Sequence, residues 1–226
     1  CALPISPTLT VVTSRVAAQY DAIAHDYAAA FSTLAPFDRG VLASFARSVT
    51  AAGGRTVLDV GCGPGTAARE LAAAGLSAVG VDRSAVMVRL ATVERAVIGD
   101  LGALPVRDGA VDAVCAWYSL VHTPTVELPA VLTEFRRVLR DDGWLLLAFQ
   151  TAAPTLEIRE AWGHEVSLDF LRHDVDEVQE MLMDCGYVLH RDALRSADKR
   201  AGESAAQAFV VARSRDHLEL RPGRGC

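Results

Sequence analysis

The chain has 226 residues, of which 51% are hydrophobic, and its formal net charge is −6. This length and apolar content suit a single globular domain with one core. A negative net charge offers no basic surface for nucleic acid, so no nucleic-acid partner is expected. No apolar run approaches the ~20 residues that a membrane-spanning helix needs, so no membrane partner is expected. Five cysteines without a C-x-x-C pair predict reduced thiols in a cytoplasmic protein.

Two amphipathic helices are expected before the sheet begins. Apolar side chains recur at helical spacing over 14–31, which Ser14 can cap, and over 38–52, where Gly53 and Gly54 end the pattern. The chain lacks an initiator Met, and we expect residues 1–13 to be a cloning scar or a disordered start. Residues 214–226 are expected to form a disordered tail.

Strands and helices then alternate along the chain. Strands are predicted over 55–60, 77–82, 96–99, 111–117 and 144–149, with helices over 66–74, 84–92 and 127–140. Because these strands are apolar throughout, they predict a parallel sheet that helices cover on both faces. Periodicity fails over 151–174, after which a helix over 175–185 precedes strands over 187–194 and 207–212.

A glycine-rich turn follows the first predicted strand. Gly61, Gly63 and Gly65 let the backbone turn tightly and approach a ligand, and the next helix offers free N–H groups at its N-terminus. A dinucleotide fingerprint is spaced G-x-G-x-x-G, whereas this turn is spaced G-x-G-x-G and follows an acid, Asp59. A carboxylate there would repel a pyrophosphate and suits a ligand with an ammonium group. Cys62, inside the turn, joins this site as a space-filling side chain and not as a nucleophile.

Acidic residues also end the second and third predicted strands. S-adenosylmethionine is a ligand of this kind, because it has an amino-acid end together with a ribose and an adenine. Asp82 is placed to accept from both of its ribose hydroxyls. Asp100 is placed to accept from the exocyclic amine of the adenine, although it could instead cap the loop at Gly102. The carboxyl ends of parallel strands meet at one edge of a sheet, which supports a single site. The other cofactor-binding candidates there are Arg83, Met87, Leu101 and Trp117, of which the Met and the Trp would also suit the core.

These motifs and two later segments resemble the class I S-adenosylmethionine-dependent methyltransferases, in the small-molecule group of types 11 and 25. The later segments are 112–122 and 134–144, and the resemblance covers nearly everything from Val16 to Arg213. It implies an α/β fold with a Rossmann-like, doubly wound sheet of seven strands, mostly parallel with the last strand antiparallel, and helices on both faces. Relatives commonly have Pro-Gly-Gly where residues 141–143 read Asp-Asp-Gly, which changes the turn chemistry alone.

The resemblance also implies one domain over 14–213. Its parts would be a helical lid over 14–52, a cofactor-binding core over 55–150, an acceptor-side insertion over 151–174 and a C-terminal helix and hairpin over 175–213. The cofactor would be S-adenosyl-L-methionine, with S-adenosyl-L-homocysteine as product. In such enzymes the N-terminal helix closes over the cofactor, so Tyr20 and Tyr27 join the cofactor-binding candidates, although both would also suit the core.

An acceptor that loses a proton during methyl transfer needs a general base. His122 follows the fourth strand and is our candidate for this catalytic role and for acceptor binding, with a helix-capping or loop-bonding role as the equal alternative. Tyr118 and His164 are further acceptor-binding candidates, although loop histidines, including His173, are usually polar surface residues. Asp112 begins its strand, away from the site, and is interpreted as a turn residue. Because no cluster of carboxylates or histidines with the spacing of metal ligands falls at the site end of the sheet, no metal is expected.

The leading hypothesis is methyl transfer from S-adenosylmethionine to an oxygen, nitrogen or carbon of a small-molecule acceptor. The alternative is a non-catalytic or repurposed protein that binds the same cofactor, because intact cofactor motifs establish binding and not turnover. A nucleic-acid methyltransferase is disfavoured because residues 116–119 lack the Asn/Asp-Pro-Pro-aromatic element. A nicotinamide oxidoreductase is disfavoured by the glycine spacing and Asp59. We expect a monomer or a homodimer, and the acceptor's identity stays open.

Overall fold

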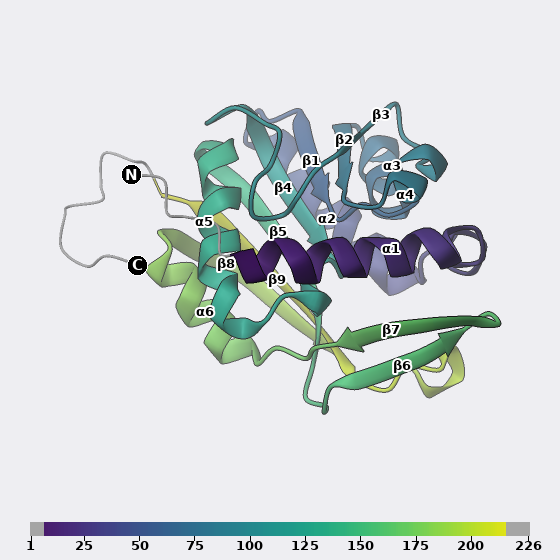
Figure 1. Ribbon diagram of the computed structural model, residues 1–226. Helices are drawn as coiled ribbons and strands as arrows, with labels where there is room; N and C mark the ends of the chain where they lie inside the picture. Colours follow the sequence, from purple (N-terminus) through teal and green to yellow (C-terminus); the bar gives the residue numbers. More distant parts are fainter. Residues whose placement is uncertain (1–6, 216–226) are drawn as a thin grey trace.

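A seven-stranded sheet forms the centre of the computed structural model, which describes residues 7–215 (Figure 1). Its strand order is β3-β2-β1-β4-β5-β9-β8. The strands are β1 (Thr56–Val60), β2 (Ser77–Asp82), β3 (Arg95–Ile98), β4 (Val111–Trp117), β5 (Leu139–Thr151), β8 (Tyr187–Arg195) and β9 (Ala206–Ser214). The first five pair in parallel, and β9 runs antiparallel to both of its neighbours. The predicted sheet, with its antiparallel last strand, is confirmed.

Helices cover both faces of this sheet, as predicted. On one face, α2 (Pro36–Ala51) and α3 (Thr66–Ala73) bury side chains such as Phe45 and Leu71 against β1 and β4. On the other face, α5 (Leu128–Val138) and α6 (Val175–Asp184) bury Phe135 and Leu182 against β4 and β5. A short helix, α4 (Ala85–Leu90), flanks β2 and β3. The two apolar layers hold the strand ends of the parallel sheet in fixed positions.

The N-terminal helix, α1 (Pro7–Ala30), lies across the front of the molecule in Figure 1. It begins before the predicted start at Ser14, so the predicted boundary at residue 13 does not hold. Residues 1–6 and 216–226, on which the predictions of a scar and of a tail also fall, lie outside the described residues. Asp21 accepts hydrogen bonds from the Ser84 hydroxyl and the Val86 amide, which fixes α1 to the start of α4.

Residues 151–174 contain a two-stranded hairpin where the sequence indicated no periodic structure. The strands β6 (Leu156–Ala161) and β7 (His164–Phe170) pair antiparallel across Trp162 and Gly163, whose φ angles are +49° and +80°. Two central residues with positive φ match the twist of a tight hairpin. The inner face of β7 buries Val166 and Leu168 against Ile23 of α1. The hairpin therefore braces the helix that covers the strand ends.

The start of β5 also differs from the prediction. We expected a helix to residue 140, a turn at 141–143 and a strand from 144, but α5 ends at Val138 and β5 begins at Leu139. The register between β4 and β5 shifts at this point: Val111 pairs with Leu139, whereas Ala113 pairs with Trp144. The predicted turn is thus an irregularity within the strand, and Asp142 in it has a φ of +58°.

Asp112 lies away from the candidate site, as predicted, but it is a residue of β4 and not the predicted turn residue. Its carboxylate accepts the Arg55 and Thr56 amides at 2.5 and 2.9 Å, and it pairs with Arg140 at 2.6 Å. These bonds hold the pKa of Asp112 below its usual value despite partial burial. They tie the starts of β1 and β4 together at the edge opposite the strand ends that carry the candidate site.

Candidate active site

A cleft opens between α1 and the carboxyl ends of β1, β2, β3 and β4. It holds about 1120 Å³ of empty space, including its open mouth. The structure brings most of the predicted site residues together there: Tyr20, Tyr27, Gly61, Gly63, Asp82, Arg83, Met87, Asp100, Leu101, Trp117, Tyr118 and His122 all line it. A sheet of this kind binds ligands at this edge.

The glycine turn forms the floor of the cleft. Gly61 and Gly63 have φ angles of +68° and +52°, and the Gly63 amide donates to Asp82 at 2.8 Å. A Cβ atom on Gly63 would meet only a ring carbon of Tyr27, at 4.0 Å, so the backbone faces open space. Asp82 also accepts from the Ser84 amide at 2.8 Å, yet burial raises the pKa of this carboxyl overall.

We expect Gly61→Ala to destabilise the fold and to weaken cofactor binding. The new Cβ would lie 2.3 Å from Cβ of Ser119, in a backbone conformation that L side chains rarely adopt. Overpacking of this kind costs roughly 1 to 3 kcal/mol, and the shifted turn would displace the amide that faces the cleft. Urea denaturation and titration with S-adenosylhomocysteine measure the two effects. Gly40→Ala, in α2 with open space at its Cβ position, is the matched control and should not weaken either property.

Some predicted cofactor contacts lie outside the cleft lining. Asp59 is 1% exposed and sits beneath the turn, where burial raises its pKa to about 7. The Cys62 thiol packs toward Gly80, a Cβ on which would lie 2.7 Å from Sγ, so its space-filling role is against the sheet. Gly65, with φ of +84°, is the N-cap residue that precedes α3. None of these three residues lines the cleft, and their direct contact with a ligand stays a prediction.

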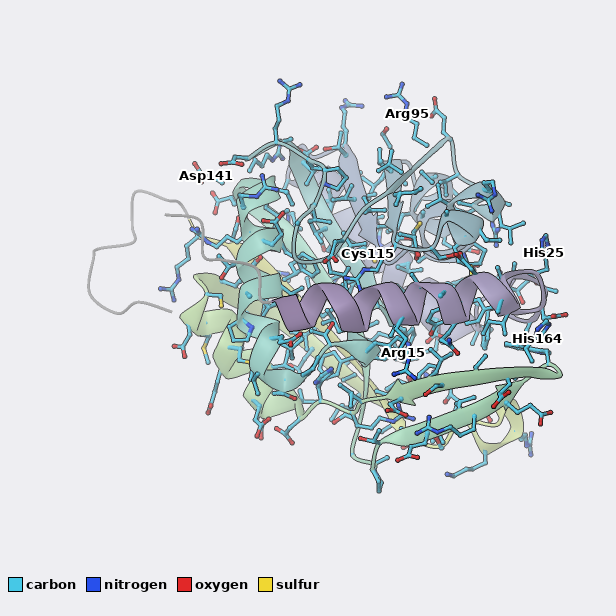
Figure 2. All side chains as sticks on the ribbon, viewed as in Figure 1. Arg15, His25, Arg95, Cys115, Asp141 and His164 are labelled. Atoms are coloured by element: carbon cyan, nitrogen blue, oxygen red, sulfur yellow. The ribbon has the colours of Figure 1, made fainter. Side chains whose placement is uncertain are left out.

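The predicted acceptor residue His164 also lies away from the cleft lining. Figure 2 shows it on the hairpin near the end of α1 that carries His25. It is exposed and lies 3.7 Å from the carboxylate of Asp26. His173 is buried, and its ring contacts the Leu120 carbonyl at 3.1 Å, so it is a structural residue and not the surface residue that its loop position suggested.

Both carboxylate oxygens of Asp100 already have partners. One accepts from the Gly102 amide at 2.8 Å, and the other forms an ion pair with Arg83. The loop-capping alternative for Asp100 is therefore confirmed, and the ion pair holds the side chains of Arg83 and Asp100 together in the cleft lining. Whether Asp100 also receives the adenine amine remains a prediction.

Tyr20 and His122 form a hydrogen-bonded pair in the cleft. The Tyr20 hydroxyl lies 2.9 Å from Nε2 of His122, and Nδ1 of the same ring lies 2.9 Å from the Asp169 carbonyl on β7. Because a carbonyl can only accept, Nδ1 carries a proton, and Nε2 of a neutral ring accepts from the tyrosine. Burial lowers the pKa of His122 and raises that of Tyr20 well above its usual value. The ring is thus neutral at neutral pH, and its basic nitrogen, Nε2, is bonded to the Tyr20 hydroxyl in the cleft.

Tyr118 faces the cleft in a strained backbone conformation. Its φ is +55°, which is uncommon for a residue other than glycine, and such strain is concentrated at functional sites. Burial is the main cause of its raised pKa, and the positive charge of Arg195 acts in the opposite direction. Arg195 is itself held by both oxygens of Glu203, at 2.8 and 2.9 Å. Tyr118 therefore combines a strained backbone with a place in the cleft lining, and its role toward an acceptor stays a prediction.

The sequence analysis missed several polar residues of this cleft. Ser84, Ser119 and Glu127 all line it, and Ser84 caps α4 by accepting from the Met87 amide. The hydroxyl of Ser119 and one carboxylate oxygen of Glu127 are buried without a hydrogen-bond partner among the described residues. A serine before an apolar helix is a recognisable cap signal. Glu127 carries no such signal, because only the folded chain brings it to the cleft.

Residues 7–215 contain neither a candidate metal site nor a membrane-spanning helix. No group of three or more His, Cys, Asp or Glu side chains in that range lies close enough to hold a metal ion. No helix of the same range is long and apolar enough to cross a membrane.

The comparisons with known proteins agree with this geometry. The profile of a family described as a methyltransferase domain matches residues 57–143, which run from the first strand through the glycine turn to the start of β5. The chain therefore contains a class I S-adenosylmethionine-dependent methyltransferase domain. Residues 57–143 of this class I methyltransferase domain contain the glycine turn, Asp82, Asp100 and His122, so the family match covers the predicted cofactor motifs.

The relatives of this class I methyltransferase domain include malonyl-acyl-carrier-protein O-methyltransferase from Erwinia billingiae, which is 36% identical over 54% of this chain and 48% of its own length. The chain spans about half the length of the curated relatives it matches. Among solved structures, the 1,6-didemethyltoxoflavin-N1-methyltransferase of Burkholderia thailandensis has a TM-score of 0.66 at 18% identity, covering 96% of this chain and 93% of that one. The (4+2)-cyclase SpnF has a TM-score of 0.66 at 19% identity, covering 90% and 97%. Identities this low support the shared fold alone.

Proposed function

We propose that this protein transfers a methyl group from S-adenosylmethionine to an oxygen, nitrogen or carbon of a small molecule, at an atom that loses a proton. The observation that carries the proposal is the Tyr20–His122 pair, which lies in the same cleft as the glycine turn and Asp82. Binding residues alone would suit any ligand of this fold. A neutral histidine bonded to a cleft hydroxyl adds the proton acceptor that such a transfer needs.

The cleft fits the cofactor at three points. Gly63 leaves open space where a side chain would stand, Asp82 ends β2 at the cleft, and Tyr27 covers the turn from α1. When bound, the cofactor supplies an electrophilic methyl group on a sulfonium, so the protein needs to align the reactants and exclude water. We assign Asp82 to the ribose and the turn to the amino-acid end, with α1 as the lid.

We assign the proton transfer to His122, acting with Tyr20. Nε2 of His122 accepts from the Tyr20 hydroxyl, and the Asp169 carbonyl holds the other ring nitrogen protonated. A proton from the acceptor can therefore pass to the Tyr20 oxygen while the proton of the Tyr20 hydroxyl passes to Nε2 of His122. The raised pKa of Tyr20 keeps its phenol protonated, so its hydroxyl donates to His122 until the ring takes a proton.

Charge in the cleft favours a neutral or cationic acceptor over a carboxylate. Of the described lining residues, Asp82, Asp100 and Glu127 are acidic, and the one basic side chain among them, Arg83, is paired with Asp100. A free carboxylate, such as that of the malonyl group named for the Erwinia relative, would find no unpaired cation there. Desolvating such a charge without a partner is costly. We therefore infer an acceptor class different from that of the malonyl carrier enzymes.

The test is methyl transfer with an isotopically labelled donor and a panel of acceptors. Calorimetry with S-adenosylmethionine, S-adenosylhomocysteine and NAD comes first, and we expect binding of the two adenosyl ligands alone. The panel then compares phenols, amines and activated carbon acids with a malonyl thioester, and transfer to the first three supports the proposal. Binding without transfer to any acceptor would favour the alternative of a repurposed binding protein, for which the cyclase named among the structural neighbours is a precedent of fold.

We further propose a cytoplasmic protein that acts as a monomer or a homodimer. Cys62, Cys115 and Cys185 are free and buried, which suits a reducing compartment. Sedimentation of the purified protein measures the assembly state.

A further inference from the structure

We propose that the carboxylate of Glu127 receives the exocyclic amino group of the cofactor's adenine, a contact that the sequence assigns to Asp100. The inference rests on the proposed use of an adenosyl cofactor and goes beyond it, because it names a residue that decides which purine the cleft accepts. Three observations on the described residues carry it.

The first observation is that Glu127 has an unused acceptor in the cleft. It lies at the end of a 3₁₀ turn (Thr125–Glu127) just before α5, and it lines the cleft. Its Oε2 atom is buried and accepts no hydrogen bond from any residue that the structure describes. A buried carboxylate oxygen without a donor costs free energy, so a ligand that brings an N–H group would be stabilised there.

The second observation is that Asp100 is occupied. One of its oxygens accepts from the Gly102 amide and the other pairs with Arg83. At Asp100 the amine would share an oxygen with one of these donors, as the ribose hydroxyls would at Asp82. Glu127 can accept the same donor without breaking any contact that its Oε2 atom makes.

The third observation is the position of Glu127 relative to the end of β3, where the adenine would lie. About two helical turns further along α5, Glu134 accepts the Leu104 amide at 2.6 Å. Val131, between the two acids, is buried and also lines the cleft. This face of α5 therefore packs on the loop that follows Asp100. Glu127 precedes α5, about one turn before Val131, and it lines the same cleft as Leu101 and Gly102.

The experiment is a binding cycle between one ligand group and one side chain. Calorimetry measures the dissociation constants of S-adenosylhomocysteine and of its analogue whose purine lacks the 6-amino group. Both ligands keep the ring nitrogens, so their affinity ratio isolates the amine. For the unsubstituted protein we expect the analogue to bind about tenfold or more weakly, the range for a hydrogen bond to a charged group.

In Glu127→Met, which keeps the length of the side chain and removes the acceptor, we expect that ratio to fall to about threefold or less. Glu127→Gln keeps a neutral acceptor and should give an intermediate ratio, and it guards against a variant that fails to fold. Glu180→Met, at an exposed position on α6, is the matched control and should keep the full ratio.

The competing assignment gives the opposite pattern. If Asp100 receives the amine, the ratio stays at its full value in Glu127→Met and collapses in Asp100→Ala, which overturns the inference and leaves the proposed function intact. If the unsubstituted protein binds neither ligand, both the inference and the proposed function fail.

Discussion

Replacing His122 with Gln is expected to lower kcat by roughly 10²- to 10⁴-fold on any acceptor that supports transfer, the usual contribution of a general base. The affinity for S-adenosylhomocysteine should change little, because the two ring nitrogens bond to the Tyr20 hydroxyl and the Asp169 carbonyl and not to the glycine turn or Asp82. Steady-state kinetics and calorimetry on the same preparations separate the two effects. An unchanged kcat would remove His122 as the base.

The role of His122 as a base also predicts how activity depends on pH. Burial lowers the pKa of His122 below its ordinary value of 6.5, so the ring stays neutral and basic at neutral pH. Activity should fall as the pH drops through this lowered pKa, below pH 6.5, and the acidic limb should disappear in His122→Gln. Tyr20→Phe should reduce kcat and keep a limb that belongs to His122. His25→Ala, exposed on the same lid helix, is the control and should leave the profile unchanged.

The cofactor half of the cleft could be predicted because its signals are local. Gly61 and Gly63 stand directly after an apolar strand, and Asp82 ends the next one, so strand direction alone brings them to one edge. The same logic places Asp59 in ligand contact, which stays a prediction, and it does not predict how deeply Asp59 is buried. Asp59 lies inside β1 and pairs in register with Gly80 and Cys115, so its side chain is buried beneath the turn.

Helix α1 and the β6–β7 hairpin that packs against it were harder to predict, for a different physical reason. Val166, Leu168 and Phe170 alternate in the sequence, and Gly163 stands at the turn, so a hairpin signal was present. It was obscured because the paired strand exposes charged residues and because a two-stranded hairpin buries only one face. Its packing on Ile23 and the bond from His122 to Asp169 join residues far apart in the chain. No local pattern reports such contacts, which is also why Glu127 was missed.

Asp59→Asn is expected to make the protein progressively more stable than the parent as the pH rises. Burial raises the pKa of Asp59 from 3.8 to about 7 in the folded protein. Folding therefore takes up a proton between these values, and the carboxyl supports the fold fully below pH 3.8 and loses that support as the pH rises to about 7. The total loss is on the order of 4 kcal/mol, at 1.36 kcal/mol per pKa unit. Asn, which does not titrate, lacks this loss.

Urea denaturation of both proteins at pH 4, 6 and 8 measures the effect as a difference, so that other titrating groups cancel. The gap in unfolding free energy should widen with pH in favour of Asp59→Asn, whereas Asp192→Asn, at an exposed position, should show no such trend. A gap that does not change with pH would mean that Asp59 is ionised in the fold throughout. The distinction bears on the site, because a carboxyl that is half neutral near pH 7 becomes a full charge beneath the glycine turn when a cation binds above it. Adding S-adenosylmethionine should therefore reduce the gap at pH 8, since an ammonium group at the turn would offset the burial of that charge.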